Sequence, residues 1–111
     1  MTVNLFSYGT LQETKVQQAV FDGPITGEPD AIVGYRLETF TITGSAAIAI
    51  SGHANHTMLE PTGDDADEIE GTRSTLSDAQ LAMADAYEDA AYKRVEVALR
   101  SGVRAWAYVR A

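Results

Sequence analysis

The stretch Phe6-Ser7-Tyr8-Gly9-Thr10-Leu11 is the most informative part of the sequence for the fold, because an apolar segment ends there at a glycine. Val3 to Ser7 is mostly apolar and begins with a β-branched residue, which predicts a strand. Glu13 to Phe21 has apolar residues at helical spacing and is predicted to be a helix. Since Gly9 has no Cβ, a ligand can approach the backbone closely, and amides ahead of a helix N-terminus bind anions. Tyr8, Gly9, Thr10 and Leu11 are therefore a candidate cradle for a carboxylate or phosphate; the alternative is an ordinary turn.

A second helix is predicted from about Asp78 to Ala90, where Ala and Leu dominate the interior. Ser77 and Gln80 have the spacing of a capping box, in which each side chain bonds the backbone amide of the other residue. Leu76 and Leu81 can pack together as a hydrophobic staple across the same helix start. These signals fix where the helix begins.

Glu88 is the acid of this helix that we single out. At about 100° per residue, it falls in a sector with apolar residues, namely Leu81, Ala84, Tyr87 and Ala91. The remaining acids of the helix are expected to face water: Asp78, Asp85 and Asp89. Burial of a carboxyl disfavours its charged form and moves its pKa toward the range of a general acid/base. The alternative is a salt bridge from Glu88 to Lys93 or Arg94.

The remaining segments read mainly as strands. The predicted strands are Ala31–Ile42 with a bulge or close approach at Gly34, Ala46–Ile50, Glu68–Thr75, and a hairpin of Tyr92–Leu99 and Val103–Val109; residues 53–60 are ambiguous. Strands outnumber helices and the connections are short. We therefore expect one α+β domain over residues 1–111, whose sheet curls into a small mixed β-barrel with flanking helices.

Composition limits the classes of function. The chain has 111 residues, 45% of them hydrophobic, a formal net charge of −8 and no cysteine. An acidic surface disfavours nucleic acid, and no apolar run approaches the roughly 20 residues of a membrane span. Without a signal peptide, a cytoplasmic protein is expected. The sequence allows a homodimer through an exposed sheet edge but does not require one.

A metal site is not expected. His53 and His56 are three residues apart, but no third ligand is apparent and the residues around them read as a loop. The aromatic residues of the final hairpin are expected mainly in the core, although Tyr92 and Tyr108 are also placed to line a pocket.

Several segments together resemble the γ-glutamylcyclotransferase-like superfamily, in its AIG2-like branch. In chain order they are Tyr8-Gly9-Thr10-Leu11, Gly34-Tyr35-Arg36-Leu37, Gly71-Thr72, Asp85-Ala86-Tyr87-Glu88, Tyr92-Lys93-Arg94-Val95 and the ending from Ser101 to Val109. The resemblance covers essentially the whole chain and implies a small mixed barrel flanked by helices.

The resemblance also implies an activity. The backbone of residues 8–11 would hold the carboxylate of a γ-glutamyl amine or peptide, and Glu88 would be the general acid/base. In the reaction of the superfamily, this acid takes a proton from the α-amine, which attacks the side-chain carbonyl and forms 5-oxoproline, with no cofactor. The alternative is a non-catalytic module that binds a small carboxylate metabolite.

Overall fold

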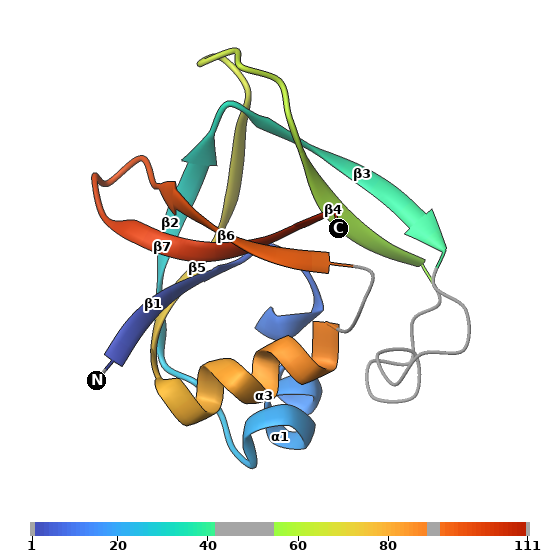
Figure 1. The fold of residues 1–111 in the computed structure, drawn as a ribbon, viewed down its shortest axis with the longest axis vertical. Helices are drawn as coiled ribbons and strands as arrows, with labels where there is room; N and C mark the ends of the chain where they lie inside the picture. Colours follow the sequence, from blue (N-terminus) through green and yellow to red (C-terminus); the bar gives the residue numbers. More distant parts are fainter. Residues whose placement is uncertain (1, 42–54, 89–91, 111) are drawn as a thin grey trace.

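The computed structural model describes residues 2–41, 55–88 and 92–110 (Figure 1). In chain order the elements are β1 (Thr2–Ser7), the 3₁₀ turn η1 (Thr10–Gln12), α1 (Thr14–Phe21), β2 (Gly27–Val33), β3 (Tyr35–Thr41), β4 (Asn55–Pro61), β5 (Glu68–Ser77), α3 (Asp78–Glu88), β6 (Tyr92–Ala98) and β7 (Arg104–Arg110). The strand expected over Ala46–Ile50 and the residue His53 lie outside the described ranges, as does Ala91.

The described strands form one seven-stranded sheet in the order β2-β5-β1-β7-β4-β3, with β6 also paired to β7. Strand β7 runs parallel to β1 and β4 and antiparallel to β6, so the sheet is mixed. This confirms the α+β class. An isolated bridge between Ile32 and Leu99 brings β2 to the residue after β6, but no continuous ladder between the described strands closes the sheet. The prediction of a barrel is therefore not confirmed.

Gly34 divides what the sequence suggested was one long strand. Its φ of +84° is a left-handed conformation that glycine adopts without strain. Before it, β2 pairs with β5; after it, β3 pairs with β4. The prediction of a single strand over Ala31–Ile42 was wrong, because the glycine changes the direction of the chain rather than adding a bulge.

The helices α1 and α3 lie together on one side of the sheet (Figure 1). Between them and the sheet is a core cluster that includes Val16, Leu76, Leu81 and Ala84. The predicted capping box is confirmed: the Gln80 amide donates to Ser77 Oγ at 3.1 Å, and the Ser77 amide donates to Gln80 Oε1 at 2.9 Å. This reciprocal pair fixes the start of α3 directly after β5.

A close approach of two strands sets the position where β1 ends. A Cβ on Gly71 of β5 would lie 2.3 Å from the carbonyl oxygen of Ser7 and 2.8 Å from Phe6 Cζ. Only a glycine leaves room for that approach. The end of β1 is thus held against β5, and the residues that follow Ser7 turn toward the end of α3 (Figure 1).

Candidate active site

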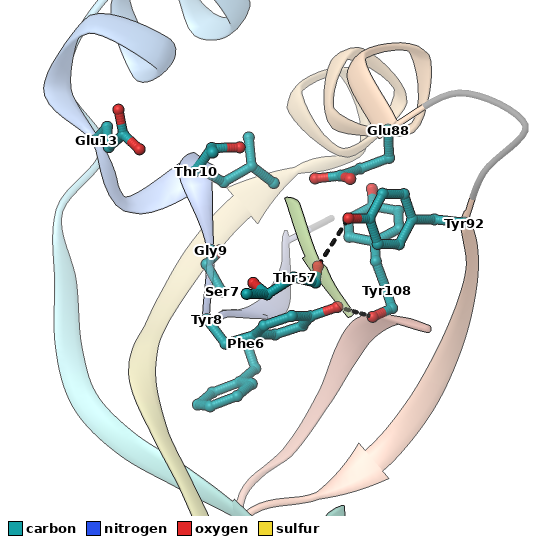
Figure 2. Close-up of a pocket in the computed structure, with 11 residues that line it drawn as sticks. Phe6, Ser7, Tyr8, Gly9, Thr10, Glu13, Thr57, Glu88, Tyr92 and Tyr108 are labelled. Carbon is teal, nitrogen blue, oxygen red and sulfur yellow. Dashed lines mark hydrogen bonds between the residues drawn. The ribbon is translucent and has the colours of Figure 1, made fainter. Parts of the chain in front are cut away.

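A cavity of about 260 Å³ lies where the end of β1 meets the end of α3. Tyr8, Gly9, Thr10 and Leu11 line it together with Glu88, so the five residues singled out from the sequence share one hollow. Figure 2 shows the Glu88 side chain extending from α3 into the space between Thr10 and Tyr92. The other walls come from strands, with Thr57 on β4, Tyr92 on β6 and Tyr108 on β7.

Gly9 lines the cavity with backbone atoms alone, because it has no side chain. Its φ of −131° is not in the left-handed region that favours glycine. A Cβ there would lie 3.4 Å from Thr57 Oγ1, on the cavity wall. In the turn η1, the Gln12 amide donates to the Gly9 carbonyl at 3.1 Å and the Glu13 amide to the Thr10 carbonyl at 2.9 Å. The amides that precede these two belong to the first turn, which has no partners for them within the helix.

The Glu88 carboxyl is desolvated. The residue is half-buried at the last described position of α3, and burial raises its pKa from 4.5 to about 8. The alternative salt bridge is not found within the described ranges: Arg94 Nε instead lies 3.2 Å from Asp85 Oδ1. A carboxyl with a pKa near 8 accepts and returns protons readily near neutral pH.

Three hydrogen bonds tie the cavity walls to one another. The Tyr8 hydroxyl donates to the Tyr108 carbonyl at 2.5 Å, and the Tyr92 hydroxyl donates to the Thr57 carbonyl at 2.8 Å (Figure 2). Thr10 Oγ1 and the Tyr87 hydroxyl are 2.6 Å apart, which links η1 to α3. The cradle and Glu88 are therefore held on a connected set of elements.

The tyrosines that line the cavity stay protonated. Burial raises the pKa of Tyr8 and of Tyr92, and the nearby Glu88 charge raises both further. Burial also raises the pKa of Tyr108, and its hydrogen bond to Asp85 adds to the effect. These phenols consequently act as hydrogen-bond donors and not as bases. Tyr92 and Tyr108 line the pocket, as the sequence allowed, while they also belong to the core cluster.

The Asp85 side chain is 41% exposed, so it faces water in part as expected, but it also contacts the hairpin strands. Its Oδ1 accepts a hydrogen bond from the Tyr108 hydroxyl at 2.7 Å and forms the ion pair with Arg94. A signal was present in the sequence, because residues three apart are neighbours on a helix surface, and Asp85 stands three before Glu88. Thr57 was also missed, since it lies in the segment whose structure the sequence left ambiguous.

Neither a metal centre nor a transmembrane helix is found in the described part of the chain. Over residues 2–41, 55–88 and 92–110, no group of three or more His, Cys, Asp and Glu side chains is placed to hold a metal ion. No helix within the same ranges has the length and apolar composition needed to cross a membrane.

Residues 5–111 match the family model described as "Gamma-glutamyl cyclotransferase, AIG2-like". No protein of curated function matches the chain. The solved structures that share its fold include a solution structure from Arabidopsis thaliana, with 23% identity, 99% of this chain and 62% of that chain covered and a TM-score of 0.69. They also include a gamma-glutamyl cyclotransferase, with 14% identity, 100% and 68% covered and a TM-score of 0.73, and an uncharacterized protein from Homo sapiens, with 14% identity, 99% and 67% covered and a TM-score of 0.76. The chain thus spans less than two thirds of the A. thaliana protein. At these identities the likeness concerns the fold alone.

Proposed function

The chain belongs to the AIG2-like gamma-glutamyl cyclotransferase family, and from that premise we propose that it is an enzyme that forms 5-oxoproline from a small γ-glutamyl amine or peptide. The observation that carries the proposal is the meeting of the desolvated Glu88 carboxyl and residues 8–11 at one cavity. Neither feature alone would suffice, because glycine turns and buried acids each occur in proteins without catalytic function.

The cavity is suited to one amino-acid-sized group. Its volume of about 260 Å³ lies just below the range of pockets that hold drug-sized ligands. In the proposed complex, the backbone amides of Gly9, Thr10 and Leu11 bind the α-carboxylate of the glutamyl group. That contact sets the α-amine and the side-chain carbonyl of the same molecule against each other.

Glu88 moves the proton that the reaction requires. As a carboxylate it takes a proton from the α-ammonium group, whose freed amine attacks the δ-carbonyl carbon. The new C–N bond closes the five-membered ring and the original amide C–N bond breaks. Glu88 returns the first proton to the departing nitrogen, and the second proton of the attacking nitrogen passes by the same route, so the product is the lactam and the amine leaves as an ammonium group. The reaction consumes no water. Because nucleophile and electrophile belong to one molecule, the pocket accelerates the reaction chiefly by holding the folded conformer.

Glu88→Gln tests the proposal. Glutamine has nearly the shape of glutamate but does not take up a proton, so 5-oxoproline release from a panel of γ-glutamyl amines and dipeptides is expected to fall by roughly 10²- to 10⁴-fold. Glu96→Gln is the matched control, since Glu96 is an exposed acid on β6 that pairs with Arg104. Full activity of Glu88→Gln would overturn the assignment of Glu88.

The same panel separates the enzyme from a binding module. A wild-type protein that binds a γ-glutamyl compound in calorimetry, yet releases no 5-oxoproline from any member of the panel, would establish the non-catalytic alternative. Release that depends on Glu88 would exclude it.

A further inference from the structure

A second open space adjoins the cavity at Glu88. This groove, about 430 Å³ in volume, shares Glu88, Tyr92 and Tyr108 with the cavity, but none of residues 8–11 lines it. Its additional walls are Asp85, Arg94 and Trp106. A molecule that lies on Glu88 can therefore occupy both spaces at once, with one end on each side of the carboxyl.

Arg94 is the positively charged residue of this groove. Its guanidinium carbon lies 4.6 Å from the centre of the Trp106 ring, a cation–π arrangement that orients the planar group. The same side chain is only 28% exposed. Its position is thus set by the ring and by Asp85 before any ligand arrives.

Most of the hydrogen-bonding capacity of Arg94 is unused within the described ranges. Nε is buried and lies 3.2 Å from Asp85 Oδ1, but the geometry there is that of an ion pair and not of an aligned hydrogen bond. For the two terminal nitrogens, no hydrogen bond to another described residue is found. A guanidinium has five N–H donors in a planar fork, which matches the two oxygens of a carboxylate.

Asp85 offers little to a positively charged ligand in this groove. Its Oδ1 already receives the Tyr108 hydroxyl and faces Arg94 Nε, so much of its acceptor capacity is taken. Glu88 favours its neutral form at neutral pH, since burial raises its pKa to about 8. Among the described residues that line the groove, Arg94 is consequently the one whose charged donors can bind an anion.

We propose that this groove receives the leaving group, and that Arg94 selects γ-glutamyl compounds whose departing amine carries a carboxylate. This inference rests on the proposed function. There the departing nitrogen takes its proton from Glu88, so that nitrogen lies beside Glu88 with its substituent directed away from the cradle. Glu88 and Arg94 both line the groove, so a substituent that extends from Glu88 into this space comes beside Arg94. Arg94 acts on specificity and takes no part in the proton transfer.

A matched pair of substrates tests this subsite. γ-Glutamylglycine and γ-glutamylglycinamide differ only in a carboxylate that becomes a neutral amide. A charge-assisted hydrogen bond in a partly buried site corresponds to a preference for the carboxylate of about 10- to 100-fold in kcat/KM. In Arg94→Gln this preference should fall to near one, chiefly because kcat/KM for γ-glutamylglycine falls. Arg94→Lys, which keeps the charge but not the fork, should retain part of it.

Two controls distinguish specificity from damage to the fold. Arg104→Gln removes an exposed arginine from β7, the strand paired with that of Arg94, and should leave the preference intact. Thermal unfolding of each variant shows whether the loss of stacking on Trp106 has disturbed the sheet.

Binding to the Glu88→Gln variant gives a second readout that does not depend on turnover. Dissociation constants for the two compounds should differ in the same direction, and the difference should vanish when Arg94→Gln is added. Equal kcat/KM and equal dissociation constants for the pair would overturn the subsite while leaving the proposed function intact. Tighter binding of γ-glutamylglycine without any 5-oxoproline would instead support the subsite and refute the enzymatic reaction.

Discussion

Substituting glutamine for Glu88 is expected to stabilise the folded protein, by an amount that grows with pH. Burial raises the pKa of Glu88 from 4.5 to about 8, so folding opposes ionisation of this carboxyl. Below pH 4.5 the group is protonated in both states and has no effect on the free energy of unfolding. Between pH 4.5 and 8 the unfolded chain ionises it and the folded chain does not, so stability is lost as the pH rises.

The magnitude follows from the two pKa values. Each pKa unit corresponds to about 1.36 kcal/mol, so Glu88 costs roughly 3 kcal/mol at pH 7 and approaches roughly 5 kcal/mol above pH 8. Glutamine is neutral at every pH and removes this cost. The free energy of unfolding of Glu88→Gln should therefore exceed that of the wild type by those amounts, with almost no difference at pH 4.

Urea unfolding of both proteins between pH 4 and 9 measures the difference. The comparison cancels the titration of the other carboxylates, and Glu96→Gln, which alters an exposed acid, is the matched control. A ¹³C-detected titration of the Glu88 side chain should have its midpoint near pH 8. A difference that does not change with pH, or a variant that is less stable at pH 7, would refute the claim that the carboxyl is desolvated.

Three further outcomes are expected. In wild-type protein, kcat/KM for 5-oxoproline release should rise about tenfold per pH unit below pH 8 and level off above it, as Glu88 becomes ionised; a flat profile from pH 6 to 9 would contradict this. Gly71→Ala should lower the urea midpoint by at least the equivalent of about 1–3 kcal/mol, because the new methyl overlaps the Ser7 carbonyl, whereas Gly23→Ala, in open space, should change stability by less than about 0.5 kcal/mol. Ser77→Ala should cost about 1 kcal/mol of unfolding free energy in the same assay, and no loss would show that the capping box contributes nothing.

Features with local causes could be predicted from the sequence. The start of α3 depends on Ser77 and Gln80, which find each other across one turn of helix whatever surrounds them. The inward position of Glu88 follows from helical periodicity. The cavity shared by Glu88 and Gly9 was expected only by way of the family resemblance, since 79 residues separate them along the chain.

Features that depend on distant partners could not be predicted in the same way. Gly34 was predicted to be a bulge because the sequence does not show which strands pair. In the structure β2 pairs with β5, and β3 pairs with β4. The contacts of Asp85 with Arg94 and Tyr108 were not predicted, because a helical wheel does not include residues that reach a helix from distant strands. Closure of the sheet likewise depends on how far each ladder extends, and no residue type signals that.

The position of β7 has a consequence for how the protein is made. This strand, near the end of the chain, joins β1 on one flank to β4 on the other (Figure 1). During synthesis, β1 and β4 leave the ribosome before β7, the strand that pairs with both of them. A nascent chain that lacks β7 has neither Tyr108 nor the carbonyl that anchors the Tyr8 hydroxyl. The cavity that Tyr8 and Tyr108 line is therefore complete only after this strand has been made, and contacts between such distant positions favour slow folding.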